Sequence, residues 1–329
     1  MFEGRGAQVI EADILQPADV LLDLYGEDIR GRAFVTHDAY RGETMLRPDF
    51  TVPVALSHIE SGFGSATYTY SGEVFRRQEI DETRPREYVQ VGFEVFGGED
   101  AAIADAQVFA AISEALNGLP VSPVIGDIGI VSALIEDLDA PERRKAALRR
   151  HIWRPSRFRE LLERFSKPID RKILAASDAP LIGLRSDAEI SDRVAALEEE
   201  NETSPISGKE VERIEAVLAV RSGLSEAISQ LSDLAPSGSA LEGAVQVLSQ
   251  RAQTFETHGL STDCLVFEAS YCRTNMEYYG GFVFGFSAAG LAVPVATGGR
   301  FDLVTYALGK AIPAVGGVVR PDLVLELGV

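Results

Sequence analysis

An amide and a carboxylate recur on one face of a predicted strand. In residues 88–96, Tyr-Val-Gln-Val-Gly-Phe-Glu-Val-Phe, a period of two places Gln90, Gly92 and Glu94 on one face and apolar side chains on the other. Two such groups four residues apart, with a glycine leaving space between them, can grip a small polar ligand that carries a cationic or donor group. A solvated sheet face is the alternative interpretation of the same stretch.

Other polar residues are placed to join this face. Arg76, near the end of the facing strand, can bring a cation that suits a ligand carboxylate or phosphate, whereas Arg77 points the other way. Asp49 and Thr51 follow Leu-Arg-Pro at the end of another strand, where they can hold an amino group or cap the following helix. Capping and ligand binding both remain open at this point.

The late part of the chain combines aromatic residues and glycines. Tyr278 and Tyr279 open an aromatic strand with three glycines, and Gly298-Gly299 lead through Arg-Phe-Asp into a predicted helix. Glycines here permit close backbone approach to a ligand or tight sheet packing. The four histidines lack metal-ligand spacing: His37, His58, His151 and His258. Neither a nucleotide-binding glycine motif nor a nucleophile elbow is present. We therefore predict no catalytic residues, no metal and no cofactor.

The elements that must position these residues indicate an α+β fold. Strands are expected at 33–36, 44–46, 66–76 and 88–96, the last two as a hairpin around an exposed charged loop at 79–87, with a helix at 101–117. Helical spacing dominates from about 127 to 259, and a second hairpin pairs 278–287 with 291–296. We therefore predict a core of residues 1–126 and 261–329 around a helical insertion, 127–260.

Composition narrows the function classes. A net charge of -19 repels phosphate backbones and argues against nucleic acid as a partner. No apolar run approaches the roughly 20 residues that span a bilayer, which argues against a membrane role. Cys264 and Cys272 lie among apolar and aromatic neighbours, as reduced core thiols do, and a cytoplasmic location is expected.

Taken in order, these motifs resemble the class II aminoacyl-tRNA synthetase core, and within that class the histidyl-tRNA synthetase family. The matching runs are Leu46–Thr51, Phe75–Gln78, Gln90–Glu94, Glu277–Tyr279 and Gly298–Asp302, and Pro17 falls where the first class motif has its proline. The resemblance implies an antiparallel sheet flanked by helices. It also implies histidine binding by the residues that surround histidine in the family: Asp49, Thr51, Arg76, Gln90, Glu94, Tyr278 and Tyr279.

Departures from the synthetase pattern point away from catalysis. Thr274 stands at the family's catalytic arginine with Arg273 displaced by one position, Gln78 replaces a glutamate, and Leu323 replaces the arginine that holds the ATP phosphates. Amino-acid activation needs positive groups on the triphosphate, so losing two of them should leave little activity. The chain also ends at Val329, where a synthetase would continue into an anticodon-binding domain of about 100 residues, and we expect no such domain.

This combination is similar to the regulatory subunits that accompany short-form ATP phosphoribosyltransferase. That resemblance implies a short catalytic subunit as partner, histidine as feedback effector in the first step of histidine biosynthesis, and a self-dimer within a hetero-octamer. The inhibitory histidine sits either in the synthetase-like pocket or at the interface between the two kinds of subunit. An enzyme that forms aminoacyl adenylates and a free-standing histidine sensor are the alternatives, and the helical insertion serves either partner docking or structural filling.

Overall fold

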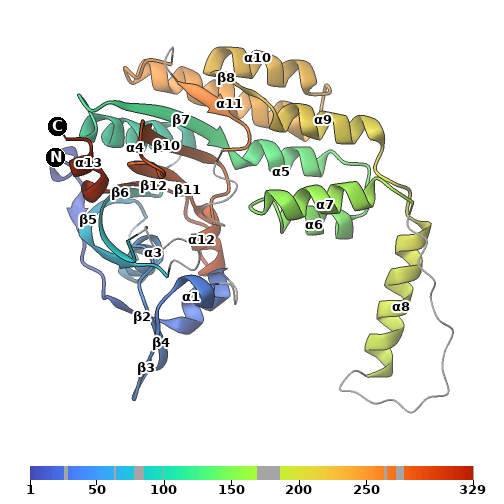
Figure 1. Ribbon diagram of the computed structural model, residues 1–329, viewed down its shortest axis with the longest axis horizontal. Coiled ribbons are helices and arrows are strands. Elements are labelled where there is room, and N and C mark those ends of the chain that lie inside the picture. Colours follow the sequence, from blue (N-terminus) through green and yellow to red (C-terminus); the bar gives the residue numbers. More distant parts are fainter. Residues whose placement is uncertain are drawn as a thin grey trace.

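A large mixed sheet forms the centre of the molecule (Figure 1). The computed structural model describes residues 1–25, 29–62, 64–77, 85–98, 100–168, 186–262, 265–271 and 278–328. Within them the strands run, in spatial order, β1 Gln8–Val9, β5 Ala66–Phe75, β6 Glu87–Phe96, β12 Ala314–Val319, β11 Ala296–Arg300, β10 Phe282–Ala288, β7 Val121–Asp127, β9 Val266–Glu268 and β8 Arg221–Gly223. A smaller sheet has the order β2 Leu15–Pro17, β4 Gly42–Leu46 and β3 Val35–Asp38.

Helices cover both faces of the large sheet. In Figure 1, α4 (Ala101–Ala115) and α11 (Ala240–Thr257) lie above it, and α3 (Thr51–Ser61) and α12 (Asp302–Ala307) lie below. The remaining helices are η1 Glu3–Arg5, α1 Ala18–Tyr25, α2 Ile29–Arg32, α5 Ile128–Glu136, α6 Glu142–Arg149, α7 Pro155–Phe165, α8 Asp187–Glu202, α9 Gly208–Leu218, α10 Leu224–Leu234 and α13 Pro321–Glu326. The α+β class is confirmed.

The first predicted hairpin is confirmed in register. β5 and β6 pair antiparallel from Ala66 opposite Phe96 to Phe75 opposite Glu87, which places Tyr70 directly across from Gly92. Most of the predicted connecting loop 79–87, namely residues 79–84, lies outside the described residues. The alternation of large apolar and polar side chains over ten residues on each strand determines this register, because a slip by one residue would turn every side chain to the opposite face.

Three strand predictions need correction. The second late strand begins at Ala296 and not at 291, since Pro294 has no N–H to donate to the ladder. The predicted strand 33–36 is displaced to Val35–Asp38, with Ala33 instead fully buried at the end of α2. β7 was not predicted because Pro123 and Gly126 argue against a strand, yet it pairs antiparallel with β10 along its whole length.

The predicted helical segment between 127 and 260 contains α5 to α11, and the short strand β8 adds an unpredicted edge to the sheet. Phe255 of α11 stacks on Phe109 of α4 at 5.3 Å between ring centroids, over the phenylalanines of β10. This part of the chain therefore packs on the sheet through a shared aromatic core. α8 is the exception, since it stands apart from the body in Figure 1. The boundaries 1–126, 127–260 and 261–329 stay a prediction.

The buried side of α11 is joined to the sheet by ion pairs. Arg251 Nε lies 2.8 Å from Asp105 Oδ2 of α4, and Arg251 Nη1 lies 2.7 Å from Asp127 Oδ2. Arg300 Nη2 lies 2.7 Å from the other oxygen of Asp105. These four side chains, named the ion-pair network below, are each less than a tenth exposed. No helix in the described ranges is long and apolar enough to cross a bilayer.

Candidate functional site

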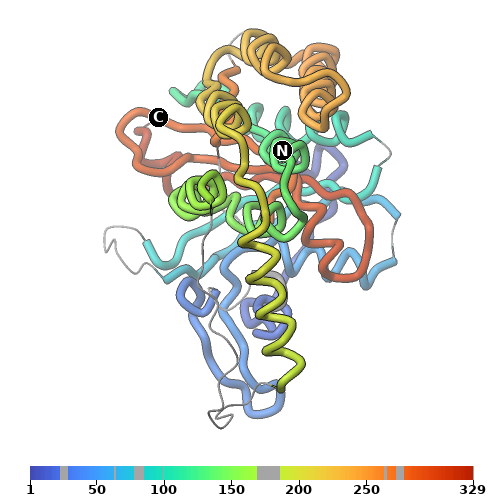
Figure 2. The backbone as a smooth tube through the Cα atoms, turned by 90° about the vertical axis from the view of Figure 1, so that its right-hand side faces the viewer, coloured from blue at the N-terminus to red at the C-terminus, as the bar shows by residue number. Residues whose placement is uncertain are grey.

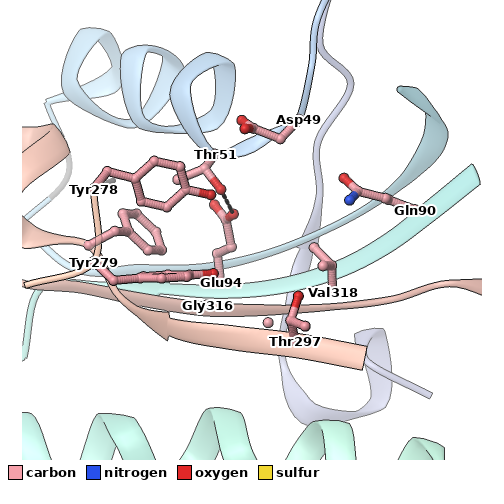
Figure 3. A pocket seen from close by; sticks show the side chains of 11 residues that line it. Asp49, Thr51, Gln90, Glu94, Tyr278, Tyr279, Thr297, Gly316 and Val318 are labelled. Atoms are coloured by element: carbon pink, nitrogen blue, oxygen red, sulfur yellow. Dashed lines mark hydrogen bonds between the residues drawn. The ribbon is translucent and has the colours of Figure 1, made fainter. Parts of the chain in front are cut away.

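A small cavity lies under the sheet, between β6, β11, β12, the start of α3 and the tyrosine pair that precedes β10 (Figure 3). Six of the seven predicted site residues line this cavity. They come from three segments that lie far apart in the sequence, so the fold brings them together. Its lining residues are Asp49, Thr51, Gln90, Glu94, Tyr278, Tyr279, Thr297, Phe301, Gly316, Gly317 and Val318.

Glu94 is the most deeply buried polar group of the cavity, with 1% of its surface exposed. Its Oε1 accepts hydrogen bonds from the hydroxyls of Thr51 and Tyr70, both at 3.1 Å. Oε2 accepts none from the described residues. The pKa of Glu94 is raised to about 8, chiefly by burial. The two hydroxyl donors oppose this rise, and the nearby negative charge of Asp49 adds to it. A ligand that offers a cation or an N–H to Oε2 would therefore be favoured here.

Thr51 and Asp49 come from the turn into α3. The cap residue of this helix is Phe50, and no side chain caps it, so the helix-capping interpretation of Asp49 and Thr51 is wrong. The Thr51 hydroxyl points instead to Glu94 (Figure 3). Asp49 is 6% exposed, on the opposite side of the cavity from Gln90. Both residues are thus held in the cavity wall by the Leu-Arg-Pro segment before them.

Gln90 is buried as well, with 4% exposed, so the alternative of a solvated sheet face is also wrong. Its Oε1 accepts no hydrogen bond from the described residues. A buried amide oxygen without a donor is costly to leave unpaired. Together with Oε2 of Glu94 it leaves two acceptors facing one small cavity, which fits a ligand that carries two donor groups.

The space above Gly92 is not free for a ligand. A Cβ at Gly92 would lie 2.1 Å from the ring of Tyr70, the residue directly opposite on β5. The glycine therefore makes room for Tyr70, which stacks on Phe50 at 4.2 Å and donates to Glu94. This corrects the expectation that the glycine leaves room for the ligand. The hairpin register carried a signal for Tyr70 that sequence analysis missed.

Arg76 lies outside the cavity lining. Its Nε donates to the carbonyl oxygen of Pro48 at 2.8 Å, and its guanidinium is 5.9 Å from the ring of Tyr88, two residues before Gln90 on the same strand. Arg320 covers the same ring at 4.0 Å. Arg76 thus lies near the Gln90 end of the cavity, where it contacts Tyr88, and it is not among the residues that line the cavity.

The far wall and floor come from the late strands. Tyr278 and Tyr279 meet edge to face at 4.9 Å, and Phe301 packs on Tyr278 at 6.4 Å. A Cβ at Gly316 would lie 2.6 Å from the Glu94 side chain, so this glycine lets the carboxylate lie flat on the floor. We did not predict Thr297, Phe301 or the residues of β12 as site residues. The glycine pair Gly298-Gly299 beside Thr297 did indicate a close backbone approach in this region.

The cavity is closed around its own side chains. Its free volume is about 10 Å³, room for about one water molecule. An amino acid therefore enters only if aromatic side chains such as the tyrosine pair move aside. The polar side chains thus already lie in the cavity, whereas the space for an amino acid has to be opened.

Comparisons with known proteins identify the family of this chain. The chain matches the Histidyl-tRNA synthetase family over residues 1–324. Proteins named ATP phosphoribosyltransferase regulatory subunit are 32% identical in Mesorhizobium japonicum, over 99% of this chain and 95% of the relative, and 30% identical in Chelativorans, over 96% and 92%. The chain belongs to this family of histidyl-tRNA synthetase-like regulatory subunits.

The fold of the family is seen in solved structures. An ATP phosphoribosyltransferase regulatory subunit/histidyl-tRNA synthetase from Bacillus halodurans aligns with a TM-score of 0.74 at 24% identity, covering 99% of this chain and 76% of that one. A histidine–tRNA ligase subunit from Alicyclobacillus acidocaldarius aligns at 0.62 and 21%, covering 99% and 88%. The class II synthetase-like fold of the regulatory-subunit family is thus confirmed.

The positions at which the sequence departs from the expected synthetase pattern lie mostly outside the described residues. Gln78, Arg273, Thr274 and Glu277 lie outside the described residues, as do Cys264 and Cys272. Leu323 is described: it is 6% exposed on α13 and packs in the core. Among the histidines, His58 is fully buried, and its Nδ1 lies 3.1 Å from the hydroxyl of Tyr68. The part of the chain that the structure describes has no cluster of metal-ligating side chains.

Proposed function

We propose that this chain is the non-catalytic subunit of an ATP phosphoribosyltransferase, that it activates a separate short catalytic subunit, and that histidine bound in the Glu94 cavity reverses the activation. Membership of the regulatory-subunit family supports the first part. The observation that supports histidine binding is a pair of buried acceptors, Glu94 Oε2 and Gln90 Oε1. Both face one cavity and accept no hydrogen bond from the described residues. Histidine offers an ammonium group and an imidazole N–H, which are two donor groups.

The proposed orientation follows the charges around the cavity. Asp49 or Glu94 receives the ammonium group or the imidazole, Gln90 fixes the orientation, and Thr51 holds Glu94 in place. Arg76, beyond the Gln90 end, faces the ligand carboxylate. Tyr278 and Tyr279 enclose the imidazole ring once they have moved to admit it.

Linkage gives the regulatory step. Histidine inhibits only if it binds the inactive assembly more tightly than the active one, and a coupling of about 1 to 3 kcal/mol is typical. Because the cavity has room for about one water, the movement that admits histidine is itself a candidate for the change that the catalytic subunit senses. We propose a hetero-octamer of four subunits of each kind, built on a self-dimer of this chain, as the assembly that undergoes the change.

The test is the rate of ATP phosphoribosyl transfer by a short catalytic subunit alone, with this protein, and with this protein plus histidine. A large rise in rate that histidine reverses is the expected result. An unchanged rate would overturn the proposal. In that case histidine-dependent pyrophosphate exchange by this chain alone would identify an aminoacyl-adenylate-forming enzyme.

A further inference from the structure

α8 packs little against the described part of the chain. It has 16 residues, and none of them is buried. In Figure 1 and Figure 2 it runs away from α9, α10 and α11. An isolated helix of this length is marginal in water, since most helical stability in proteins comes from packing one face against another element. A surface that receives α8 would supply that packing.

Only the C-terminal half of α8 is fastened to its own chain. Arg144, 1% exposed, lies 2.9 Å from Glu200, and Arg143 donates to the carbonyl oxygen of Ala196 at 2.8 Å. At the other end the contacts among the described residues are local, a capping box between Ser186 and Glu189. The first turns of α8 therefore extend into solvent from a fixed base.

The surface of α8 combines negative charge with an apolar stripe. Residues 187–202 contain seven acidic side chains and one basic one, Arg193, a net of -6. Ile190, Val194 and Leu197 follow one another at helical spacing on one side, with Ile190 37% exposed. An acidic helix with such a stripe fits an apolar groove with a basic rim.

The chain contains an apolar groove beside its most basic segment. Residues 142–167 hold ten Lys and Arg against three Glu, a net of +7 within a chain of net -19. There α7 and α9 enclose a groove of about 330 Å³ whose apolar walls are Phe158, Leu162, Ile214 and Leu218. Two charged side chains, Arg159 of α7 and Glu215 of α9, stand exposed on the rim, and the Arg159 side is the one that suits an acidic helix.

We propose that α8 of one copy of this chain lies in the α7–α9 groove of a second copy, with the stripe inward and acidic side chains toward Arg159. Its own groove is out of reach, because Arg143 and Arg144 hold the base of α8 while the helix, about 24 Å long, points away from the body. A two-fold axis would repeat the contact, each copy giving one helix and receiving another. The proposal does not rest on histidine binding or on a catalytic partner.

The test crosslinks two differently labelled copies of the full chain. In a Cys264→Ser, Cys272→Ser background, protein with Ile190→Cys is mixed with protein with Leu218→Cys and oxidised gently. We expect a covalent two-chain species on a non-reducing gel, at least fivefold above the yield of the control pair Ile190→Cys with Val247→Cys. Val247 is 49% exposed on α11, away from the groove.

Charge reversal sharpens the test. Arg159→Glu should lower the crosslinking yield at least fivefold, and Glu198→Arg, four residues after Val194 on the edge of the stripe, should restore it. A yield equal to the control pair would overturn docking in the groove. Efficient crosslinking within single chains that carry both cysteines, without two-chain product, would overturn the second copy as the occupant.

Discussion

The Glu94 cavity and the ion-pair network both bury carboxyl groups against the same sheet. The carboxylates of the network are paired with guanidinium groups, whereas Glu94 is bonded to neutral hydroxyls. Asp105 is enclosed by two guanidinium groups at 2.7 and 2.8 Å. Burial raises its pKa, and the charges of Arg251 and Arg300 oppose that rise. Glu94 has only two hydroxyl donors, both on one oxygen, and a second carboxylate, Asp49, nearby.

The difference separates a structural role from a binding role. Both carboxylates of the network are paired with guanidinium groups of the same chain, so the network joins α11 to α4 and β11 without a ligand, although Arg300 Nε has no acceptor among the described residues. In the cavity, Glu94 Oε2 and Gln90 Oε1 accept no hydrogen bond from the described residues, and we propose that donor groups of a bound ligand pair with them. A buried carboxyl without a cation is costly for folding, so its presence in a cavity points to a ligand that provides one.

The largest expected effect is on the network. Arg251→Met keeps an unbranched apolar stem, shorter than that of arginine, and leaves Asp105 and Asp127 with less compensating charge. Breaking a buried pair by removing one partner typically costs about 3 to 5 kcal/mol, and we expect a loss of that size in the free energy of unfolding by urea. Arg157→Met, which breaks an exposed pair with Glu160, is the control and should change it little. Equal losses in the two variants would remove the contrast.

The next effect is on the cavity. Glu94→Gln replaces the acceptor with an amide, and histidine affinity measured by calorimetry should fall about 10- to 100-fold, the range for a lost hydrogen bond to a charged group. Unfolding free energy should not fall with it, because the variant removes a buried ionisable group. Glu87→Gln, exposed on the same strand, should bind as the parent does. Unaltered affinity in Glu94→Gln would place histidine elsewhere, for example at the interface with the catalytic subunit.

The third prediction concerns pH. The pKa of Glu94 is raised from 4.5 to about 8 in the folded protein, so between these values the folded state binds more protons than the unfolded state. Its contribution to stability is therefore complete at low pH and is lost as pH rises toward 8, with a slope of at most about 1.4 kcal/mol per pH unit. Urea unfolding from pH 5 to 9 should show a decline that Glu94→Gln reduces. Identical pH profiles would mean that Glu94 is not the group that titrates.

The smallest effect is expected for Tyr70→Phe, which removes one hydroxyl donor from Glu94 and keeps the stack on Phe50. We expect a loss of about 1 kcal/mol in unfolding free energy and a further rise in the pKa of Glu94, since the Tyr70 hydrogen bond lowers it. Tyr40→Phe, at a side chain that is 99% exposed, is the control. A pKa of Glu94 that does not move, followed by carboxyl NMR, would argue against the hydrogen bond.

Six of the seven residues predicted from the sequence line one cavity, so the sequence motifs predicted which distant segments meet there. The period of two in β6 placed Gln90 and Glu94 on one face, and the resemblance added Asp49, Thr51 and the tyrosine pair from distant segments. Sequence reasoning missed Tyr70, because cross-strand neighbours become visible only once the register of β5 against β6 is known. It also missed β7, whose strand conformation is imposed by β10 and β9 against the preference of Pro123 and Gly126.

The histidine response of the Glu94→Gln protein tests the central claim most directly. ATP phosphoribosyl transfer by a short catalytic subunit is measured with the parent chain and with Glu94→Gln, over a range of histidine concentrations. The account predicts equal activation by both proteins without histidine, and inhibition that needs about 10- to 100-fold more histidine with the variant. Inhibition of both assemblies at the same histidine concentration would contradict it.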